Sequence, residues 1–250
     1  FYTSFFENSR IRSVERYGDA GKEVHGQEPG TVMTVDFELD GVRFTALNGG
    51  PYFTFNPSIS FFVNCRSESE ADAVWNRLSE GGKVLMEYGE YPFSKKYGWT
   101  EDRYGLSWQV ILPEEEPRHR FIPSLLFVGE KCGKAEEAIH FYTSLFRDAK
   151  VGSLFRYGSG HEPEGPSDLM YADFELEGQL FAAMDSALEH NFDFNEAVSF
   201  IINCGDQREV DYYWNKLSAV PESEQCGWLK DRFGISWQVV PTVLYELMKR

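Results

Sequence analysis

The chain has 250 residues, of which 42% are hydrophobic, and this is enough to build the core of one large domain or of two ordinary ones. Its formal net charge of -16 repels phosphate backbones and anionic lipid headgroups, so neither nucleic acid nor a membrane is an expected partner. No stretch has the roughly 18 consecutive apolar residues of a membrane helix, and the first residues do not resemble a leader, so we expect a cytoplasmic protein.

The first half of the chain returns in the second half as a series of matching blocks. Residues 1–6 (FYTSFF) return as residues 141–146 (FYTSLF), and residues 32–41 return as residues 169–178. The block that starts at Tyr97 returns from Cys226 with nine identities in fifteen positions. The chain is therefore an internal duplication, and we expect domains at residues 1–113 and 121–250 with a linker at 114–120.

In the first copy, apolar residues at helical spacing predict a helix that is followed by two strands. The apolar positions are Ala71, Val74, Trp75 and Leu78. The strands are predicted around Trp99 and over residues 107–111, with a turn at 102–105 between them. Because the copy begins in the middle of a repeated block, we expect a first strand and the start of a helix to precede Phe1 in the natural protein.

The second copy shows the same order of elements from its beginning. The pattern predicts strands at 121–128, 151–157 and 197–204, helices at 134–146 and 209–218, and a hairpin from Met170 to Met184 that turns at Glu177-Gly178. The offset between the copies falls from 140 to 129 before the last block, so about ten residues are missing there and one strand should be shortened. Each copy thus reads as an α+β fold of two βαβββ modules, with a curved mixed sheet and helices outside.

The final blocks, DRYGLSWQV from Asp102 and DRFGISWQV from Asp231, resemble the PhnB-like branch of the vicinal-oxygen-chelate superfamily. This superfamily includes glyoxalase I, bleomycin-resistance proteins and extradiol dioxygenases, and PhnB-like members often carry the label 3-demethylubiquinone-9 3-methyltransferase. The resemblance covers nearly the whole chain. It implies two tandem glyoxalase-like domains, the first without its first strand, each with a cup-shaped sheet that could enclose a small molecule, and a chain that could form a homodimer.

The resemblance also indicates where a metal would be held. Enzymes of the superfamily bind a divalent ion through His, Gln and Glu side chains that project from four strands into the cup. The Glu position falls on Gln109 and Gln238 here, and a His position falls on Ser60 and Ser199. Because neutral amides bind cations weakly and the strand 121–128 offers no His or Glu, we expect no metal and no other cofactor.

Several residues are candidates for lining a ligand pocket, each with a simpler structural alternative. Gln109 and Gln238 could hydrogen-bond a polar ligand or could satisfy buried backbone groups. Trp99 and Trp228 could stack on a ligand, although duplicated aromatic residues also commonly fill a core. The remaining candidates are Ser60 and Ser199, and Asn48 and Asp185, which end the fourth strands at the rim of each cup.

Other reactive residue types give no comparable signal. The four cysteines form no CxxC pair, so we expect reduced thiols, and the five histidines share no metal-binding spacing, so we expect them to be exposed. Asp102-Arg103 and Asp231-Arg232 suggest ion pairs within turns. No catalytic residue can be assigned.

These patterns favour a small-molecule-binding protein of the vicinal-oxygen-chelate fold without an intact metal site. One alternative is an enzyme, either a metal-dependent glyoxalase or dioxygenase type or the labelled methyltransferase. A methyltransferase needs a site for S-adenosylmethionine, and no glycine-rich turn from strand to helix is present for it. Another alternative is a structural role in which the duplicated domains mainly pair with each other or with a second chain.

Overall fold

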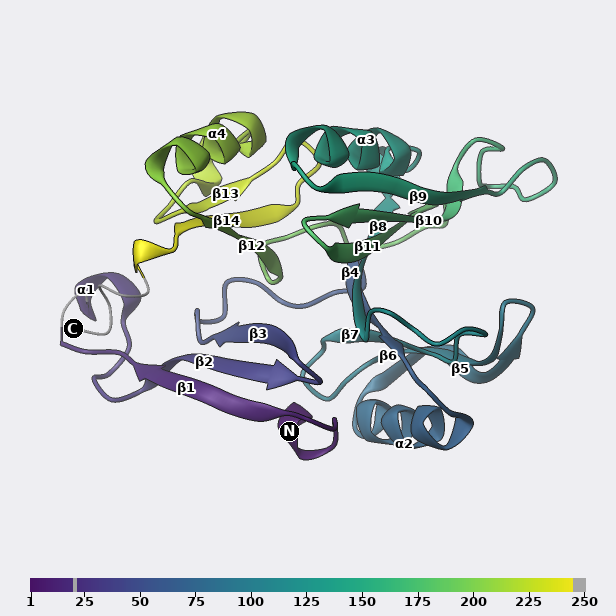
Figure 1. The fold of residues 1–250 in the computed structure, drawn as a ribbon, viewed down its shortest axis with the longest axis horizontal. Coiled ribbons are helices and arrows are strands. Elements are labelled where there is room, and N and C mark those ends of the chain that lie inside the picture. The colour runs from purple at the N-terminus through teal and green to yellow at the C-terminus, as the bar shows by residue number, and fades with distance from the viewer. Residues whose placement is uncertain (20–21, 245–250) are drawn as a thin grey trace. The chain divides into compact units, whose positions relative to one another are not determined.

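The computed structural model describes residues 1–19 and 22–244, without the side chains of Val24 and His25. The chain forms two compact units that follow the two copies of the repeat (Figure 1). The first unit contains residues 1–54 and 62–121, and the second contains residues 55–61 and those from Ile122 onward. Among the described residues, no helix is both long enough and apolar enough to span a membrane.

The first unit contains two sheets, with strand orders β1-β2-β3 and β5-β6-β7-β4. Its elements are η1 (Tyr2–Ser4), β1 (Arg10–Arg16), α1 (Lys22–His25), β2 (Val32–Leu39), β3 (Val42–Leu47), β4 (Ile59–Asn64), α2 (Glu68–Ser79), β5 (Lys83–Tyr91), β6 (Ser94–Glu101) and β7 (Ser107–Ile111). The first three residues of β4 lie in the segment that belongs to the second unit. Asp40 and Gly41 join β2 to β3 with positive φ angles of 43° and 84°, a backbone that favours glycine.

Helix α2 forms where the sequence predicts it, because its start is capped and one face is apolar. The Ser67 hydroxyl accepts a hydrogen bond from the backbone N–H of Glu70 at 3.2 Å. The four predicted apolar residues of this helix are all buried. Helix α2 also packs closely on β6, since a Cβ atom at Gly98 would lie only 2.6 Å from the ring of Trp75.

The second unit repeats this plan with sheets β8-β11-β10-β9 and β12-β14-β13. Its elements are β8 (Phe121–Val128), η2 (Gly129–Lys131), α3 (Ala135–Leu145), β9 (Ala149–Arg156), β10 (Leu169–Leu176), β11 (Gln179–Ser186), β12 (Ser199–Cys204), α4 (Gln207–Leu217), η3 (Pro221–Ser223), β13 (Trp228–Lys230) and β14 (Ser236–Pro241). Figure 1 shows α3 and α4 on the same side of these two sheets. The predicted turn at Glu177-Gly178 is confirmed, with positive φ angles of 49° and 80°.

The last module of the second unit corrects one expectation. Three strands are expected after its helix, but only β13 and β14 form within the described residues, and β13 has three residues. The counterpart of the nine-residue strand β5 is replaced by η3 and an isolated bridge between Gln225 and Trp228. The shortening that the offset predicts is confirmed, and it is larger than expected because ten residues are nearly the length of a whole strand and its turn.

A buried aspartate organises the core of each unit in the same way. In the second unit, Asp231 accepts hydrogen bonds from the hydroxyl of Tyr142 at 2.7 Å and from the indole N–H of Trp237 at 2.8 Å. Backbone N–H groups at positions 233 and 235 donate to its other oxygen. Burial raises the pKa of Asp231, and these four donors act in the opposite direction.

The first unit reproduces this arrangement with its own residues. Asp102 accepts from the hydroxyl of Tyr2 at 2.7 Å and from the indole N–H of Trp108 at 2.9 Å. Backbone N–H groups at positions 104 and 106 complete the set. The internal duplication therefore extends to individual hydrogen bonds.

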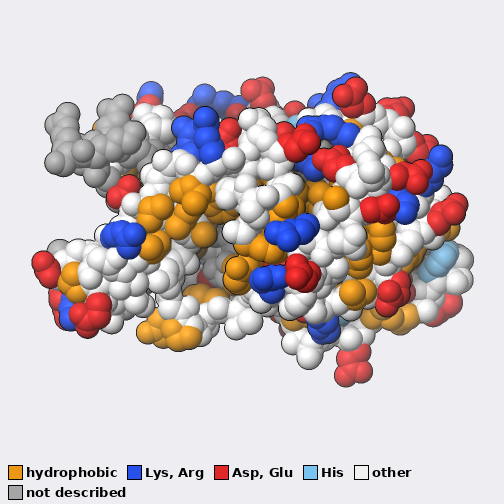
Figure 2. All heavy atoms as spheres, turned by 90° about the horizontal axis from the view of Figure 1, so that it is seen from below, with side chains coloured by type: hydrophobic (Ala, Val, Ile, Leu, Met, Phe, Trp, Pro, Cys, Tyr) orange, Lys and Arg blue, Asp and Glu red, His pale blue; other side chains and the backbone are white. Residues whose placement is uncertain are grey.

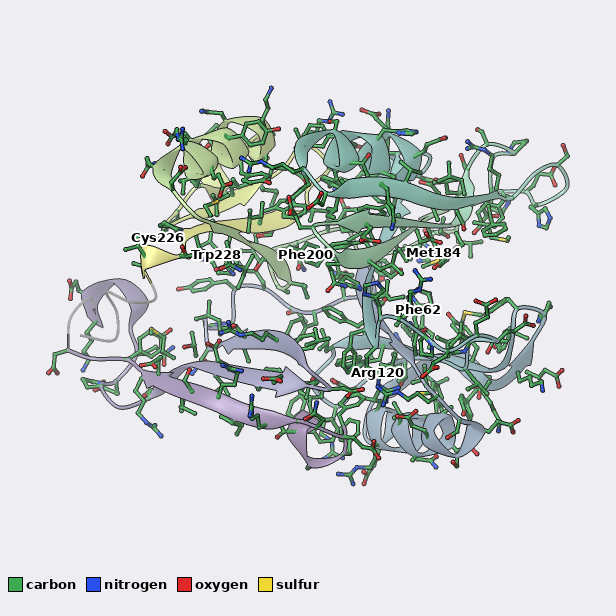
Figure 3. The ribbon with its side chains drawn as sticks, in the orientation of Figure 1. Phe62, Arg120, Met184, Phe200, Cys226 and Trp228 are labelled. Atoms are coloured by element: carbon green, nitrogen blue, oxygen red, sulfur yellow. The ribbon has the colours of Figure 1, made fainter. Side chains whose placement is uncertain are left out.

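An acidic pair at equivalent positions is neutralised differently in the two units. In the first unit, Arg120 contacts Glu70 at 2.5 Å and Asp40 at 3.5 Å, and its side chain is only 6% exposed. Figure 3 labels Arg120 at the start of β8, beside α2. Because the arginine is buried with two carboxylates, it ties the end of the 114–120 segment to the body of this unit.

In the second unit the arginine comes from a different part of the repeat. Arg147 approaches Glu209 at 3.3 Å, and its backbone N–H donates to Glu177 at 3.1 Å. Its side chain is 80% exposed. The duplication has kept the acidic pair, which contacts the buried Arg120 and the exposed Arg66 in the first unit and the exposed Arg147 in the second.

Candidate functional site

Two predicted residues of the first unit, Trp99 and Gln109, lie on the face of the β5-β6-β7 sheet that carries no helix. Gly98 faces Trp75 of α2, so alternation along β6 directs Tyr97 and Trp99 to the opposite face. Gln109 is the register partner of Trp99 on the neighbouring strand and shares this face. We call this surface the first helix-free face.

Polar groups on the first helix-free face are bonded to one another. The Tyr97 hydroxyl donates to the side-chain oxygen of Gln109 at 2.6 Å, and the Trp99 indole N–H donates to the Ser107 hydroxyl at 2.7 Å. Gln109 is 1% exposed and Ser107 is fully buried. Burial also raises the pKa of Tyr97 above its ordinary value of 10.0, which keeps the hydroxyl protonated as a donor.

In the second unit the equivalent face lies on the β12-β14-β13 sheet. Leu229 and Trp237 are register partners in the core beneath α4, so their neighbours Trp228 and Gln238 point to the opposite side. Ser199 lies on the neighbouring strand β12. We call this surface the second helix-free face.

The polar side chains on the second helix-free face are less buried than those on the first and make fewer hydrogen bonds with one another. Gln238 donates to the Ser199 hydroxyl at 2.9 Å, and all three predicted side chains are half-buried. Cys226, an exposed residue labelled with Trp228 in Figure 3, occupies the place of Tyr97 and supplies no hydroxyl. Within the described residues, the Trp228 indole N–H has no hydrogen-bond partner, whereas the equivalent Trp99 has one.

The other three predicted residues lie on or next to the strands β4, β3 and β11. Ser60 is 1% exposed on β4. Asn48 is exposed at the end of β3, where its amide donates to the backbone carbonyl of Val32 at 3.1 Å. The structure thus brings together Trp99 with Gln109, and Trp228 with Gln238 and Ser199.

Asp185 is held by backbone groups around the start of α3. Its carboxylate is 1% exposed and accepts hydrogen bonds from the N–H groups of Gly133, Ala135 and Leu169 at 2.7 to 3.2 Å. Burial raises its pKa despite these three bonds. Both carboxylate oxygens of Asp185 already accept backbone hydrogen bonds, so this residue does not need a ligand to satisfy it.

The expected ion pairs within the two turns are wrong. Arg103 pairs with Glu80 at 3.3 Å, and Arg232 pairs with Glu137 at 3.2 Å. The neighbouring aspartates instead accept from tyrosine and tryptophan in the core, where a neutral donor costs less to bury than a guanidinium does. The recurrence of the tyrosine at an offset of 140, and of the aspartate and tryptophan at 129, was the signal that could have revealed this network.

Histidines and acidic residues do not gather into a metal site in the described part of the chain. His140 and His161 are exposed as expected, His119 and His190 are half-buried against expectation, and the side chain of His25 lies outside the described residues. No group of three or more His, Cys, Asp or Glu side chains among the described residues could hold an ion.

The residues at the positions of superfamily metal ligands do not fit a divalent ion. Gln109 uses its oxygen to accept from Tyr97, and Gln238 is bonded to Ser199. Both are neutral amides, and a cation would have to displace these bonds without gaining a carboxylate. No reaction step that needs a metal follows from this arrangement.

A comparison with protein families identifies the chain's relatives. The family described as 3-demethylubiquinone-9 3-methyltransferase matches residues 1–111 and 119–240. The chain belongs to this family. A search of curated proteins gives no significant match.

A search of solved structures finds proteins that are similar to parts or to nearly all of the chain. The PhnB protein of Bacillus cereus is 42% identical over 44% of this chain and 84% of its own, with a TM-score of 0.40. A protein of Staphylococcus aureus is 34% identical over 45% of this chain and 81% of its own, with a TM-score of 0.22. Glyoxalase I of Zea mays is 14% identical but covers 99% of this chain and 89% of its own, with a TM-score of 0.56. The tandem chain therefore has the glyoxalase fold.

Proposed function

We propose that this PhnB-like protein binds a small, flat, uncharged molecule on the second helix-free face, without a metal. Trp228, Gln238 and Ser199 would make the contacts. The observation that carries the proposal is the indole N–H of Trp228, which is half-buried beside an amide and a hydroxyl and has no partner among the described residues. A ligand acceptor would complete this donor set.

The chemistry of these groups limits the ligand. An indole ring offers an apolar surface for stacking together with a single N–H donor. The amide and the hydroxyl are neutral, and the net charge of -16 disfavours anionic molecules. On the surface drawn in Figure 2, acidic and basic side chains of the described residues interleave with hydrophobic patches, which supports neutral partners over nucleic acid.

The Trp228 indole N–H provides a site-specific test. We suggest titrating the protein with 1-indanone, a flat ketone, and with indane, which lacks the carbonyl, while following indole N–H signals by NMR. The Trp228 signal, assigned by its absence in Trp228→Phe, should shift with 1-indanone. Trp228→Phe should weaken 1-indanone binding about fivefold to tenfold and change indane binding less than twofold.

A matched control distinguishes binding to this face from binding to aromatic side chains elsewhere in the unit. Trp214 lies on α4, packed against the core on the other side of the sheet, so Trp214→Phe should leave 1-indanone affinity within twofold of the original. If 1-indanone leaves the Trp228 signal unmoved at saturation, or if both variants weaken binding equally, the proposed face is wrong.

The enzyme alternatives require other ligands. A metal-dependent glyoxalase or dioxygenase should co-purify with about one divalent ion per unit and be stabilised by it. A methyltransferase should bind S-adenosylmethionine and perturb tryptophan fluorescence. We expect neither, because the candidate metal positions carry neutral, already bonded side chains; either positive result would replace the binding proposal with an enzyme.

A further inference from the structure

Asn48 of the first unit combines a reactive sequence with an open position. Of the nine asparagines in the chain, Asn48 is the one that precedes a glycine. It directly follows β3, and both Asn48 and Gly49 are exposed and lie outside regular secondary structure. In such a pair the backbone nitrogen of the glycine can attack the side-chain amide carbon of the asparagine, because glycine has no side chain to block the approach.

The backbone nitrogen of Gly49 is not held by the rest of the structure. Its N–H has no hydrogen-bond partner among the described residues. The space around the residue is also open, since a Cβ atom built at Gly49 would meet the side chain of Leu47 only at 3.6 Å, an ordinary contact. Exposed backbone without hydrogen bonds changes conformation at little cost, so this nitrogen can move toward the neighbouring amide.

One weak contact restrains the amide that would be attacked. The side-chain nitrogen of Asn48 donates to the backbone carbonyl of Val32 at 3.1 Å in an exposed position, where water competes for both groups. The backbone of Asn48 is held more firmly, because its N–H donates to Met33 at 2.8 Å and its carbonyl accepts from the hydroxyl of Tyr17 at 2.8 Å. The side chain can therefore leave its place while the strand stays paired.

Two other asparagines of the same segment lack these conditions. Asn56 precedes Pro57, whose backbone nitrogen carries no hydrogen and cannot act as the nucleophile. Asn64 lies on β4, is only 9% exposed, and donates to the backbone carbonyl of His119 at 2.7 Å. The segment thus contains one reactive asparagine and two natural controls.

The second copy carries an aspartate at the equivalent position. Asn48 corresponds to Asp185 at an offset of 137, and three backbone N–H groups meet the Asp185 carboxylate. In the first unit the side chain of residue 48 instead faces the carbonyl of Val32, which needs a donor. A carboxylate at position 48 would lose this hydrogen bond and repel the carbonyl oxygen.

We propose that Asn48 is a site of spontaneous deamidation. The nitrogen of Gly49 forms a bond to the side-chain amide carbon, the bond from that carbon to the side-chain nitrogen breaks, and the proton lost by Gly49 leaves with the released ammonia. Water then opens either carbonyl of the resulting succinimide ring and gives aspartate or isoaspartate at position 48. Water is the only co-reactant, and each event adds one negative charge. The site lies in the first unit and does not depend on the function proposed for the second.

Mass spectrometry can locate the change within one peptide. Trypsin releases residues 44–66 as a single peptide that contains Asn48, Asn56 and Asn64. We suggest incubating the full chain at 37 °C and pH 8.0 and following the conversion of each amide to an acid by fragment ions. Asn48 should convert several times faster than the other two, and more slowly at pH 6.0, because the nitrogen of Gly49 must lose its proton. Equal conversion of the three asparagines would overturn the proposal.

Gly49→Ala is the matched control for the attacking nitrogen. Gly49 is not among the glycines with positive φ, and the added methyl group makes only an ordinary contact with Leu47, so the variant should fold as the original protein does. It should slow the conversion of Asn48 several-fold, because a side chain on the attacking residue hinders ring closure. The proposal is wrong if the variant and the original protein convert equally fast. It is also wrong if Asn48 stays unchanged in the folded chain while a synthetic peptide of residues 44–53 converts.

Asn48→Asp reproduces one product and tests its effect on the fold. The variant should melt about 1 to 2 °C lower than the original protein, because a carboxylate cannot donate to the carbonyl of Val32. A melting temperature equal to or above that of the original protein would contradict the expected loss of this contact.

Discussion

The two helix-free faces carry the same glutamine, tryptophan and serine types and differ in how many of their hydrogen bonds are already made. On the first, Tyr97 holds Gln109 and Ser107 holds Trp99. On the second, Cys226 replaces the tyrosine, and the strand equivalent to β5 is gone. The duplicated framework thus has its polar side chains bonded to one another in the first copy, and in the second it leaves one indole N–H without a partner among the described residues.

The buried aspartates test whether the shared framework is equally important in both units. Asp231→Ala would leave four donors without an acceptor, so we expect a loss of about 3 to 5 kcal/mol in the free energy of unfolding. Tyr142→Phe removes one donor only and should cost about 1 kcal/mol. Asp102→Ala should destabilise the first unit similarly in urea unfolding; a loss below about 1 kcal/mol in either unit would contradict the equivalence.

The acidic pair tests a difference between the units. Arg120→Met would remove the buried cation from Glu70 and Asp40, of which Asp40 would keep only the exposed Arg66, and we expect a cost of about 3 kcal/mol. Arg147→Met removes an exposed side chain and should cost less than about 0.5 kcal/mol. Equal losses in the free energy of unfolding of the two variants, measured by chemical denaturation, would show that burial of the arginine does not affect its contribution to stability.

Tyr97→Phe should sharpen the comparison of the two faces. The change removes the donor to Gln109 in a buried setting, so we expect a loss of about 1 to 2 kcal/mol in stability. Cys226→Ser, at the equivalent exposed position, should be nearly neutral. If Tyr97→Phe proves neutral in a thermal melt, the first face is not closed by this hydrogen bond.

The smallest expected effect is a pH dependence of the stability of the second unit. Burial lowers the pKa of His190 below its ordinary value of 6.5, because the neutral ring is favoured in the folded protein. The unfolded chain therefore takes up a proton first, and the contribution of His190 to stability is present above pH 6.5 and is lost as the pH falls below it. The first copy has Pro51 at the equivalent position.

His190→Gln should therefore flatten the decline of stability below pH 6.5 by a small amount. Melting temperatures of the variant and the original protein, compared between pH 7.5 and 5.5, give the measurement. A parallel decline in both proteins would assign the effect to other groups.

Much of the local structure could be predicted from the sequence, because short-range patterns carry it. The periodicity of residues 135–145 and the turn at Glu177-Gly178 depend on neighbours along the chain, and both are confirmed. Trp228 and Gln238 were also predicted to lie in strands, and the alternation of side chains along a strand indicates which residues share a face. The loss of a whole strand in the last module was underestimated, because the length of a gap does not say whether a shortened strand still pairs.

The hydrogen-bond partners were less accessible to sequence reasoning. Asp185 was expected at a rim, and the structure surrounds it with three backbone N–H groups from two places in the chain, the start of α3 and the start of β10. Whether a polar group is satisfied depends on residues distant in sequence, which periodicity does not describe.

The sequence by itself determined the duplication, the order of most helices and strands, and the absence of acidic residues at the expected metal positions. Only the tertiary structure decided which duplicated side chains have a hydrogen-bond partner, as Gln109 has in Tyr97, and which have none within the described part of the chain, as is true of the indole N–H of Trp228. The physical reason is that secondary structure follows from local spacing, whereas hydrogen-bond satisfaction is set by the atoms that folding brings together.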